Sequence, residues 1–160
     1  MNVRDFYGTS IWDVSLYKAW SQIVQVMIPN LQFVHNSLKQ VCLSAECDEI
    51  ILFEKNSFLI IDSYERKPDT KSIHKYERIS TIVKQFKLSC SKIGSIISHM
   101  SFQSPKFRAV LDDFTKTTYL LVVSFNPGVK TAALTTNIKC IKNFFKKNSD
   151  DLKDILFTED

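Results

Sequence analysis

Apolar side chains recur every three or four residues along the first third of the chain. This spacing is typical of one buried stripe on an α-helix. Pro29 interrupts the stripe, and a proline inside a helix removes a hydrogen bond and clashes with the preceding turn. We therefore expect either two helical segments or one kinked helix, meeting near residues 28–30. The stripe consists of Leu16, Trp20, Ile23, Val24, Met27, Leu31, Val34, Leu38 and Val41.

Two short apolar runs follow, at residues 49–54 and 57–64, with a turn at residues 54–56 between them. They are rich in β-branched and aromatic residues, which predicts a β-hairpin. Their nearly continuous apolar character indicates burial on both faces of a sheet. Residues 107–112 and 118–125 predict two further strands, and residues 100–104 are compatible with a short additional one.

A second long helix is predicted from about Ser72 to His99, and its apolar arc is wider than one face requires. Such a helix has two things to pack against. A last helix follows the turn at residues 126–128 and ends near Asn148. The order is α-β-β-α-β-β-β-α, so we predict an α/β (α+β) fold with about five strands in a central sheet and long helices on both faces.

The 160-residue chain is 44% hydrophobic and carries 21 basic and 17 acidic residues, a net charge of 21 − 17 = +4. This length suits one domain. The lysines are spread along the chain, which argues against a nucleic-acid partner. We find no signal peptide and no apolar run that could span a bilayer, so we expect a cytoplasmic protein with free thiols that reaches a membrane only through partners.

Motifs for catalysis or cofactor binding are not apparent. Neither a phosphate-binding loop nor a dinucleotide-binding glycine motif occurs, and the three histidines lack zinc-ligand spacing. Cys90 falls on the apolar stripe of the long helix, where a core position is the simpler interpretation. Asp112 and Asp113 are explained by entry into a turn. We therefore predict no enzymatic activity, no metal and no cofactor for this chain, and the wide apolar helix points to association.

Several sequence blocks resemble the RagA class of Rag-type small GTPases. Residues 9–13 (TSIWD) resemble the end of the family's nucleotide-binding domain, and residues 16–24 (LYKAWSQIV) resemble the start of its C-terminal domain. Residues 28–30 (IPN), 48–54 (DEIILFE), 76–80 (YERIS) and 84–92 (KQFKLSCSK) match in the same order. The resemblance covers about residues 6–148.

The resemblance implies a roadblock-like (longin-like) fold and a division of the chain into three parts. Residues 1–13 would be the remnant of a nucleotide-binding domain, 14–148 the roadblock-like dimerisation domain, and 149–160 an acidic, flexible tail. GTP or GDP and magnesium would bind only in the full-length parent. The alternative is a stand-alone roadblock-type adaptor that has no nucleotide domain.

By the same resemblance, the domain would pair with a RagC/RagD-class GTPase, or with a second copy when isolated. It would dock on a Ragulator-like roadblock scaffold at the lysosomal or vacuolar membrane, where the parent signals amino-acid sufficiency to TORC1. The expected dimer interface, on the long helix and the strand at residues 102–111, is Ile79, Ile82, Val83, Phe86, Cys90, Ile93, Phe102, Phe107 and Ala109. The expected core is Trp20, Ile23, Leu52, Phe53, Ile60, Leu121, Val123, Ile138, Ile141 and Phe145.

Overall fold

The N-terminal stripe forms two helices. The computed structural model describes residues 8–10, 15–28, 30–67, 75–94 and 98–148. Helix α1 spans Ser15–Met27 and helix α2 spans Leu31–Ser44, so the break falls where the sequence predicts it. Asn30, between the helices, adopts a left-handed backbone conformation with φ of 58°. This conformation cannot continue a right-handed helix, so the chain changes direction there.

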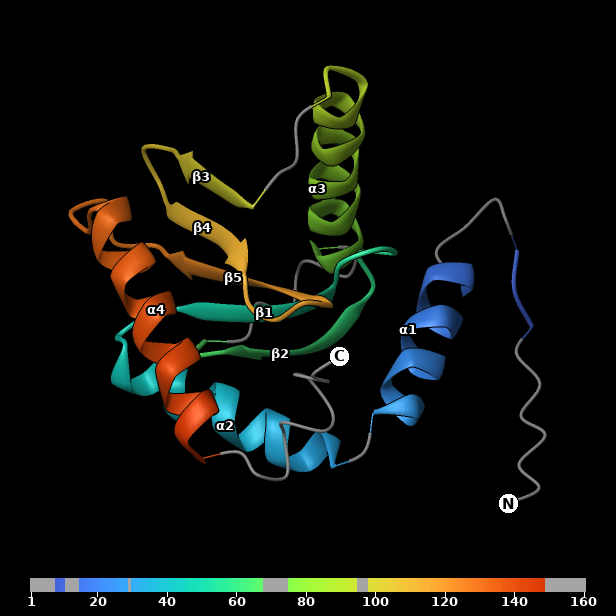
Figure 1. The fold of residues 1–160 in the computed structure, drawn as a ribbon, viewed down its shortest axis with the longest axis horizontal. Helices are drawn as coiled ribbons and strands as arrows, with labels where there is room; N and C mark the ends of the chain where they lie inside the picture. The colour runs from blue at the N-terminus through green and yellow to red at the C-terminus, as the bar shows by residue number, and fades with distance from the viewer. Residues whose placement is uncertain (1–7, 11–14, 29, 68–74, 95–97, 149–160) are drawn as a thin grey trace.

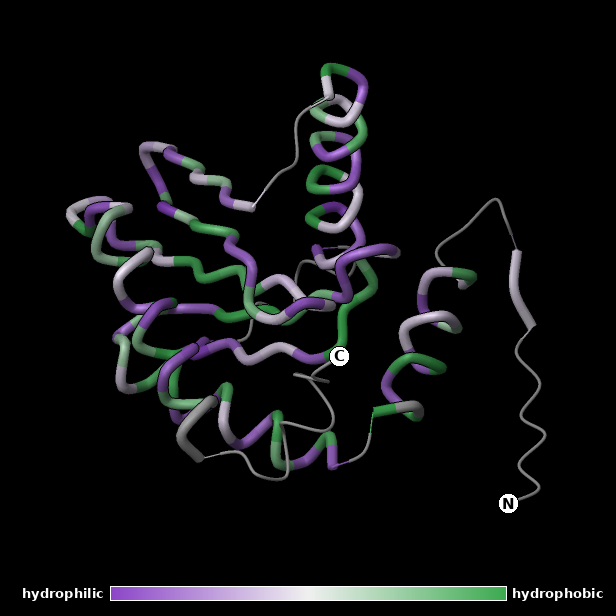
Figure 2. Tube along the Cα trace, viewed as in Figure 1, coloured by the Kyte–Doolittle hydropathy of each residue, from purple (hydrophilic) through white to green (hydrophobic). Residues whose placement is uncertain are grey.

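Five antiparallel strands form one sheet in the order β2-β1-β5-β4-β3. The strands are β1 (Glu49–Glu54), β2 (Ile60–Glu65), β3 (His99–Gln103), β4 (Arg108–Asp113) and β5 (Thr118–Ser124). Strand β5 lies at the centre and is buried along its whole length. The short additional strand predicted at residues 100–104 is β3, which forms one edge of the sheet. Figure 2 shows hydrophobic residues concentrated in the central strands.

Strand register assigns alternate residues to opposite faces of the sheet. Leu52 pairs with Leu120 and Ile50 with Val122, and these four side chains belong to the cluster that packs under α2 and α4 (Thr131–Asn148). Ile51 pairs with Leu121 on the other face, which α3 (Lys75–Lys92) covers. Figure 1 shows α2 and α4 on one side of the sheet and α3 on the other. The predicted arrangement of helices on both faces is confirmed.

Eight of the ten predicted core residues are buried: Leu52, Phe53, Ile60, Leu121, Val123, Ile138, Ile141 and Phe145. The prediction was wrong for Trp20 and Ile23, whose side chains are 52% and 37% exposed. Helix α1 packs against the edge strand β2, and its buried residue is Ala19. The helix therefore lies at the margin of the core: Val24 packs against it, whereas Trp20 and Ile23 remain uncovered.

The predicted central helix is too long. Helix α3 ends at Lys92, and Gly94 follows with φ of +72°, a left-handed conformation that commonly ends helices. His99, the predicted end of the helix, begins β3 instead. The predicted helix start at residues 72–74, most of the 1–13 segment and the tail at 149–160 lie outside the described residues. Within the described part of the chain, no helix is long and apolar enough to cross a membrane.

Candidate functional site

An apolar groove lies between α3 and the face formed by β3, β4 and β5. Its volume is about 280 Å³. The groove exists because α3 packs on only part of its sheet face: of the helix's 18 residues, Ser80 and Val83 alone are buried. The lining residues are Glu49, Lys75, Ile79, Ile82, Val83, Phe102, Phe107, Ala109, Leu121, Val123 and Phe125.

Six of the nine residues predicted for an interface line this groove. Val83 and Ala109 are buried and form its floor, whereas Ile79, Phe102 and Phe107 are half-buried and Ile82 is exposed. The other three do not line it: Phe86 and Cys90 lie further along α3, and Ile93 directly follows the helix. Phe86 and Ile93 are exposed, and Cys90 is half-buried, so the core interpretation of Cys90 was wrong. Cys90 lies near the end of α3, and no residue of this helix after Val83 is buried.

The edge of the sheet differs from the expectation. Residues 102–111 do not form one strand, because residues 104–107 connect β3 to β4 and Leu111 lies in the second of these strands. Strand β3 pairs with β4 on one side only and ends the five-strand order. An edge strand presents unpaired backbone N–H and C=O groups to a partner. The groove therefore lies beside an open sheet edge.

A buried ionic network closes one end of the groove. The Lys75 ammonium lies 2.8 Å from a Glu49 carboxylate oxygen and 2.9 Å from a Glu65 oxygen. The Tyr76 hydroxyl donates to the same Glu65 oxygen at 2.5 Å. Burial lowers the pKa of Lys75, but its two carboxylate partners outweigh this and leave that pKa raised. This network fixes the start of α3 to β1 and β2.

Glu49 is the least expected residue of the groove. It is only 1% exposed, and its second carboxylate oxygen, Oε1, has no hydrogen-bond partner among the residues that the structure describes. Burial raises the pKa of Glu49 despite the hydrogen bond from Lys75. Removing a carboxylate from water without full compensation is costly. The groove thus offers an unused acceptor at its polar end. Sequence patterning missed Glu49 and Lys75, since a charged residue at a strand or helix start is ordinarily solvated.

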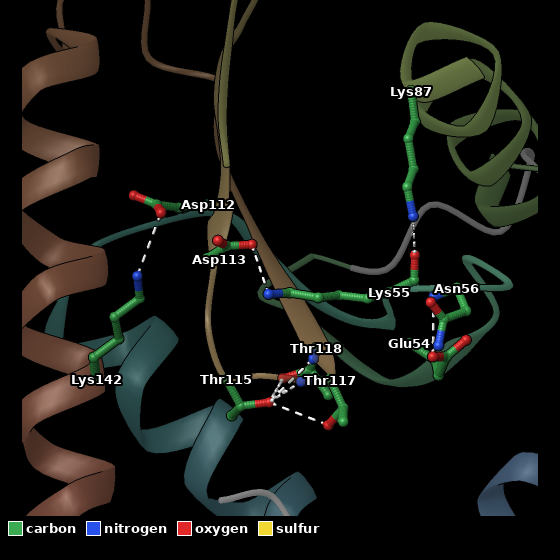
Figure 3. Close-up of polar contacts among 10 residues, drawn as sticks. All are labelled: Glu54, Lys55, Asn56, Lys87, Asp112, Asp113, Thr115, Thr117, Thr118 and Lys142. Carbon is green, nitrogen blue, oxygen red and sulfur yellow. Dashed lines mark hydrogen bonds and ion pairs between the residues drawn. The ribbon is translucent and has the colours of Figure 1, made fainter. Parts of the chain in front are cut away.

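Two more polar contacts hold α3 toward the β1–β2 hairpin. The Ser80 hydroxyl donates to the Phe58 carbonyl oxygen at 2.6 Å. The Lys87 ammonium donates to the Lys55 carbonyl oxygen at 2.8 Å, as Figure 3 shows. The Lys87 ammonium also lies 5.0 Å from the centroid of the Phe58 ring. These contacts explain why α3 stands over β1 and β2 and leaves β3 and β4 open.

The β1–β2 turn is organised by Glu54. Its carboxylate accepts hydrogen bonds from the backbone N–H of Asn56 at 2.9 Å and from the backbone N–H and hydroxyl of Ser57, both at 2.6 Å. Burial alone would raise the pKa of Glu54, but these hydrogen bonds lower it below its ordinary value. Figure 3 shows Glu54 and Asn56 in this turn. The turn is therefore held by an ionised carboxylate.

Asp112 and Asp113 both form ion pairs at the end of β4. Asp113 lies 2.8 Å from the Lys55 ammonium, and Asp112 lies 3.3 Å from the Lys142 ammonium of α4 (Figure 3). These pairs connect β4 to the β1–β2 turn and to α4. The acidic pair thus has a structural role beyond entry into a turn. Among the described residues, no group of three or more His, Cys, Asp or Glu side chains could hold a metal ion.

Comparison with known proteins identifies the family of the chain. Residues 1–83 match the model of the Gtr1/RagA G protein conserved region. The chain belongs to the Gtr1/RagA G protein family. It is 43% identical over 141 residues to Ras-related GTP-binding protein A of Dictyostelium discoideum, covering 88% of this chain and 46% of that protein. The chain therefore spans about half the length of this curated relative and corresponds to the C-terminal region of a Rag-type GTPase.

Two further likenesses concern a second class of family member and the fold. GTP-binding protein GTR2 of Saccharomyces cerevisiae is 36% identical over 78 residues, covering 49% of this chain and 22% of that protein. Myxococcus xanthus MglB superposes with a TM-score of 0.60 at 13% identity, covering 74% of this chain and 96% of that one. The predicted roadblock-like fold is confirmed.

Proposed function

We propose that this chain is the dimerisation and scaffold-docking domain of a RagA-type GTPase and that the groove between α3 and β3–β5 is its dimer interface. One observation carries the proposal: an apolar groove beside an open edge strand contains six of the nine residues predicted for association. Large exposed apolar surfaces on soluble domains commonly mark interaction sites. In this proposal the domain itself performs no chemistry.

The partner would cover two elements at once. Its helix would pack beside α3, over the half-buried Phe102 and Phe107 and the exposed Ile82. Its edge strand would pair with β3 and join the two sheets, because both edges need backbone hydrogen bonds. A stable interface of this kind buries on the order of 1,600 Å².

Charge on α3 favours a different chain over a second copy as the partner. Lys75 is compensated by Glu49 and Glu65, but α3 carries four further basic residues, Arg78, Lys84, Lys87 and Lys92, and one acidic residue, Glu77. In a homodimer two positively charged helices would lie together, and like charges across an interface weaken binding. A partner helix with fewer basic residues avoids this repulsion. We propose a RagC/RagD-class domain as that partner, and the likeness to GTR2 supports a second GTPase class in the family.

In the same proposal the full-length parent binds and hydrolyses GTP with magnesium, as a heterodimer that docks on a Ragulator-like roadblock scaffold. The scaffold would recruit it to the lysosomal or vacuolar surface, where it would signal amino-acid sufficiency to TORC1. The names of the relatives, which are GTP-binding proteins, support the nucleotide part of this proposal.

Two measurements test the proposal. Sedimentation velocity of the chain alone and mixed with a RagC-class C-terminal domain should reveal a heterodimer in the mixture. A mixture that stays monomeric at high micromolar concentration, with both components folded, would contradict it. Titration with fluorescent GTP and GDP analogues and magnesium should give no saturation, and micromolar magnesium-dependent binding would contradict the non-catalytic role of the domain.

A further inference from the structure

Two cysteines face each other where α2 joins β1. Cys42 lies in the last turn of α2, and Cys47 follows the helix end by three residues and precedes β1 by two. Both side chains are fully buried, and their sulfur atoms are 3.2 Å apart. A disulfide bond requires a separation of about 2.05 Å. The two sulfur atoms would therefore have to approach each other by only about 1 Å to form a disulfide bond.

The backbone imposes this proximity. The backbone N–H of Cys47 donates to the carbonyl oxygen of Cys42 at 3.2 Å. Each thiol is also directed at the other residue's carbonyl oxygen, at 3.1 Å for the Cys42 thiol and 3.5 Å for the Cys47 thiol. These reciprocal contacts close a loop of six residues, from 42 to 47. The backbone hydrogen bond at the end of the helix therefore brings the two residues together.

We propose that Cys42 and Cys47 form a redox-modification site, in which hydrogen peroxide oxidises the two thiols to an intramolecular disulfide that thiol reductants reverse. This proposal is independent of the dimerisation proposed above. The other two cysteines do not form such a pair: Cys90 lies on α3 and Cys140 on α4, and these helices cover opposite faces of the sheet.

The two thiols have different roles in this reaction. The hydrogen bond from Cys47 lowers the pKa of Cys42, and the same hydrogen bond, together with burial, raises the pKa of Cys47. The Cys42 thiolate is the nucleophile, since a thiolate and not a thiol attacks peroxide. It takes one peroxide oxygen, becomes a sulfenic acid and releases hydroxide. The released hydroxide takes the proton of the Cys47 thiol and becomes the first water molecule. The Cys47 sulfur then attacks the Cys42 sulfur and displaces the sulfenic oxygen as hydroxide, which takes up the proton that Cys42 lost on ionisation and becomes the second water molecule. In sum, two thiols and one hydrogen peroxide give one disulfide and two water molecules.

The residues between the two cysteines lie at the surface. Leu43, Ser44 and Glu46, between the two cysteines, are exposed, and Glu46 has a left-handed backbone conformation with φ of 50°. Such a conformation is unfavourable for a residue other than glycine or asparagine. Local opening of this turn admits a small oxidant without global unfolding. The disulfide would then tie the end of α2 to the start of β1 and restrict the unfolded chain.

The experiment isolates the pair in a Cys90→Ser/Cys140→Ser background. The folded protein is treated with hydrogen peroxide, its remaining thiols are alkylated, and it is digested with a protease that cleaves after glutamate. Cleavage after Glu46 separates the two cysteines, so the fragments stay joined only if the disulfide is present. We expect joined fragments that separate on reduction, and a melting temperature about 5 °C higher in the oxidised protein. Cys42→Ser in the same background is the matched control and should give no joined fragments.

Two outcomes would overturn the proposal. In the first, Cys42 and Cys47 remain alkylatable at peroxide concentrations that oxidise the exposed Cys140 of the unsubstituted chain. In the second, the disulfide forms in urea but not in the folded protein, which circular dichroism monitors. If the Cys90→Ser/Cys140→Ser protein does not fold, the same digestion of the unsubstituted chain gives the same answer. Cys90 and Cys140 then share one fragment, residues 78–159, which is distinct from the fragments that contain Cys42 and Cys47.

Discussion

Replacing Ile82 with alanine tests whether the groove is the interface. Ile82 lines the groove and is 58% exposed in the isolated chain, and a partner helix beside α3 would cover that exposed part. Complete burial of an isoleucine side chain contributes about 1.5–3 kcal/mol, so the uncovered share corresponds to about 1–2 kcal/mol. We therefore expect the Kd of the heterodimer to rise about 5- to 30-fold.

Leu88→Ala is the matched control. Leu88 lies on the same helix and is 49% exposed, but it does not line the groove. Its six-residue offset from Ile82 places it on another side of α3, since a helix turns about 100° per residue. Removal of an exposed side chain outside an interface changes free energy by less than about 0.5 kcal/mol, so the Kd should change by no more than about twofold. Neither substitution should greatly change the melting temperature of the isolated domain.

Isothermal titration calorimetry of each variant against a RagC-class C-terminal domain measures both constants directly. The reasoning is refuted if Ile82→Ala binds as tightly as the unsubstituted domain while Leu88→Ala binds more weakly. That result would place the partner on the other side of α3. Equal and unchanged affinity for both variants would remove α3 from the interface altogether.

Three further predictions concern stability, measured by urea unfolding. Phe145→Ala should lower the free energy of unfolding by about 3–5 kcal/mol because the ring is buried. Trp20→Ala should lower it by clearly less, because the Trp20 side chain is half-exposed. Lys75→Met should cost about 3–5 kcal/mol because it leaves the buried Glu49 carboxylate unpaired, and adding Glu49→Gln should recover part of the loss. Because the pKa of Glu54 is lowered in the folded protein, its carboxylate stabilises the fold fully above pH 4.5, the ordinary pKa. This stabilisation is lost as the pH falls through the lowered pKa of the folded protein. Glu54→Gln should therefore make the free energy of unfolding fall less steeply in acid.

The repeating pattern of apolar residues was sufficient to predict most of the fold. Alternation and apolar runs identified the strands because each strand of this sheet is buried on one or both faces. The stripe Leu134, Ile138, Ile141 and Phe145 identified the buried side of α4, and all four residues are in the core. The break between the helices that end at Met27 and begin at Leu31 was expected from the chemistry of proline. These features depend on neighbours in sequence, so the sequence contains them directly.

The same pattern failed at Trp20 and Ile23. Periodicity shows which face of a helix is apolar, but it does not show whether another element covers that face. Helix α1 packs mainly against the edge strand β2, and the position of an edge is a property of strand order. Strand order depends on pairings between distant residues, which no local pattern specifies.

Tertiary structure alone decided the features of the groove and of the thiol pair. Lys75 meets Glu49 and Glu65 only because β1 and β2 pair and α3 begins above them. The open side of the groove exists because polar contacts hold α3 toward the β1–β2 hairpin. Cys42 and Cys47 are five residues apart, which is compatible with many geometries, and the end of α2 brings their sulfurs together. In each case the decisive quantity is a distance set by packing, and residue identity alone does not determine that distance.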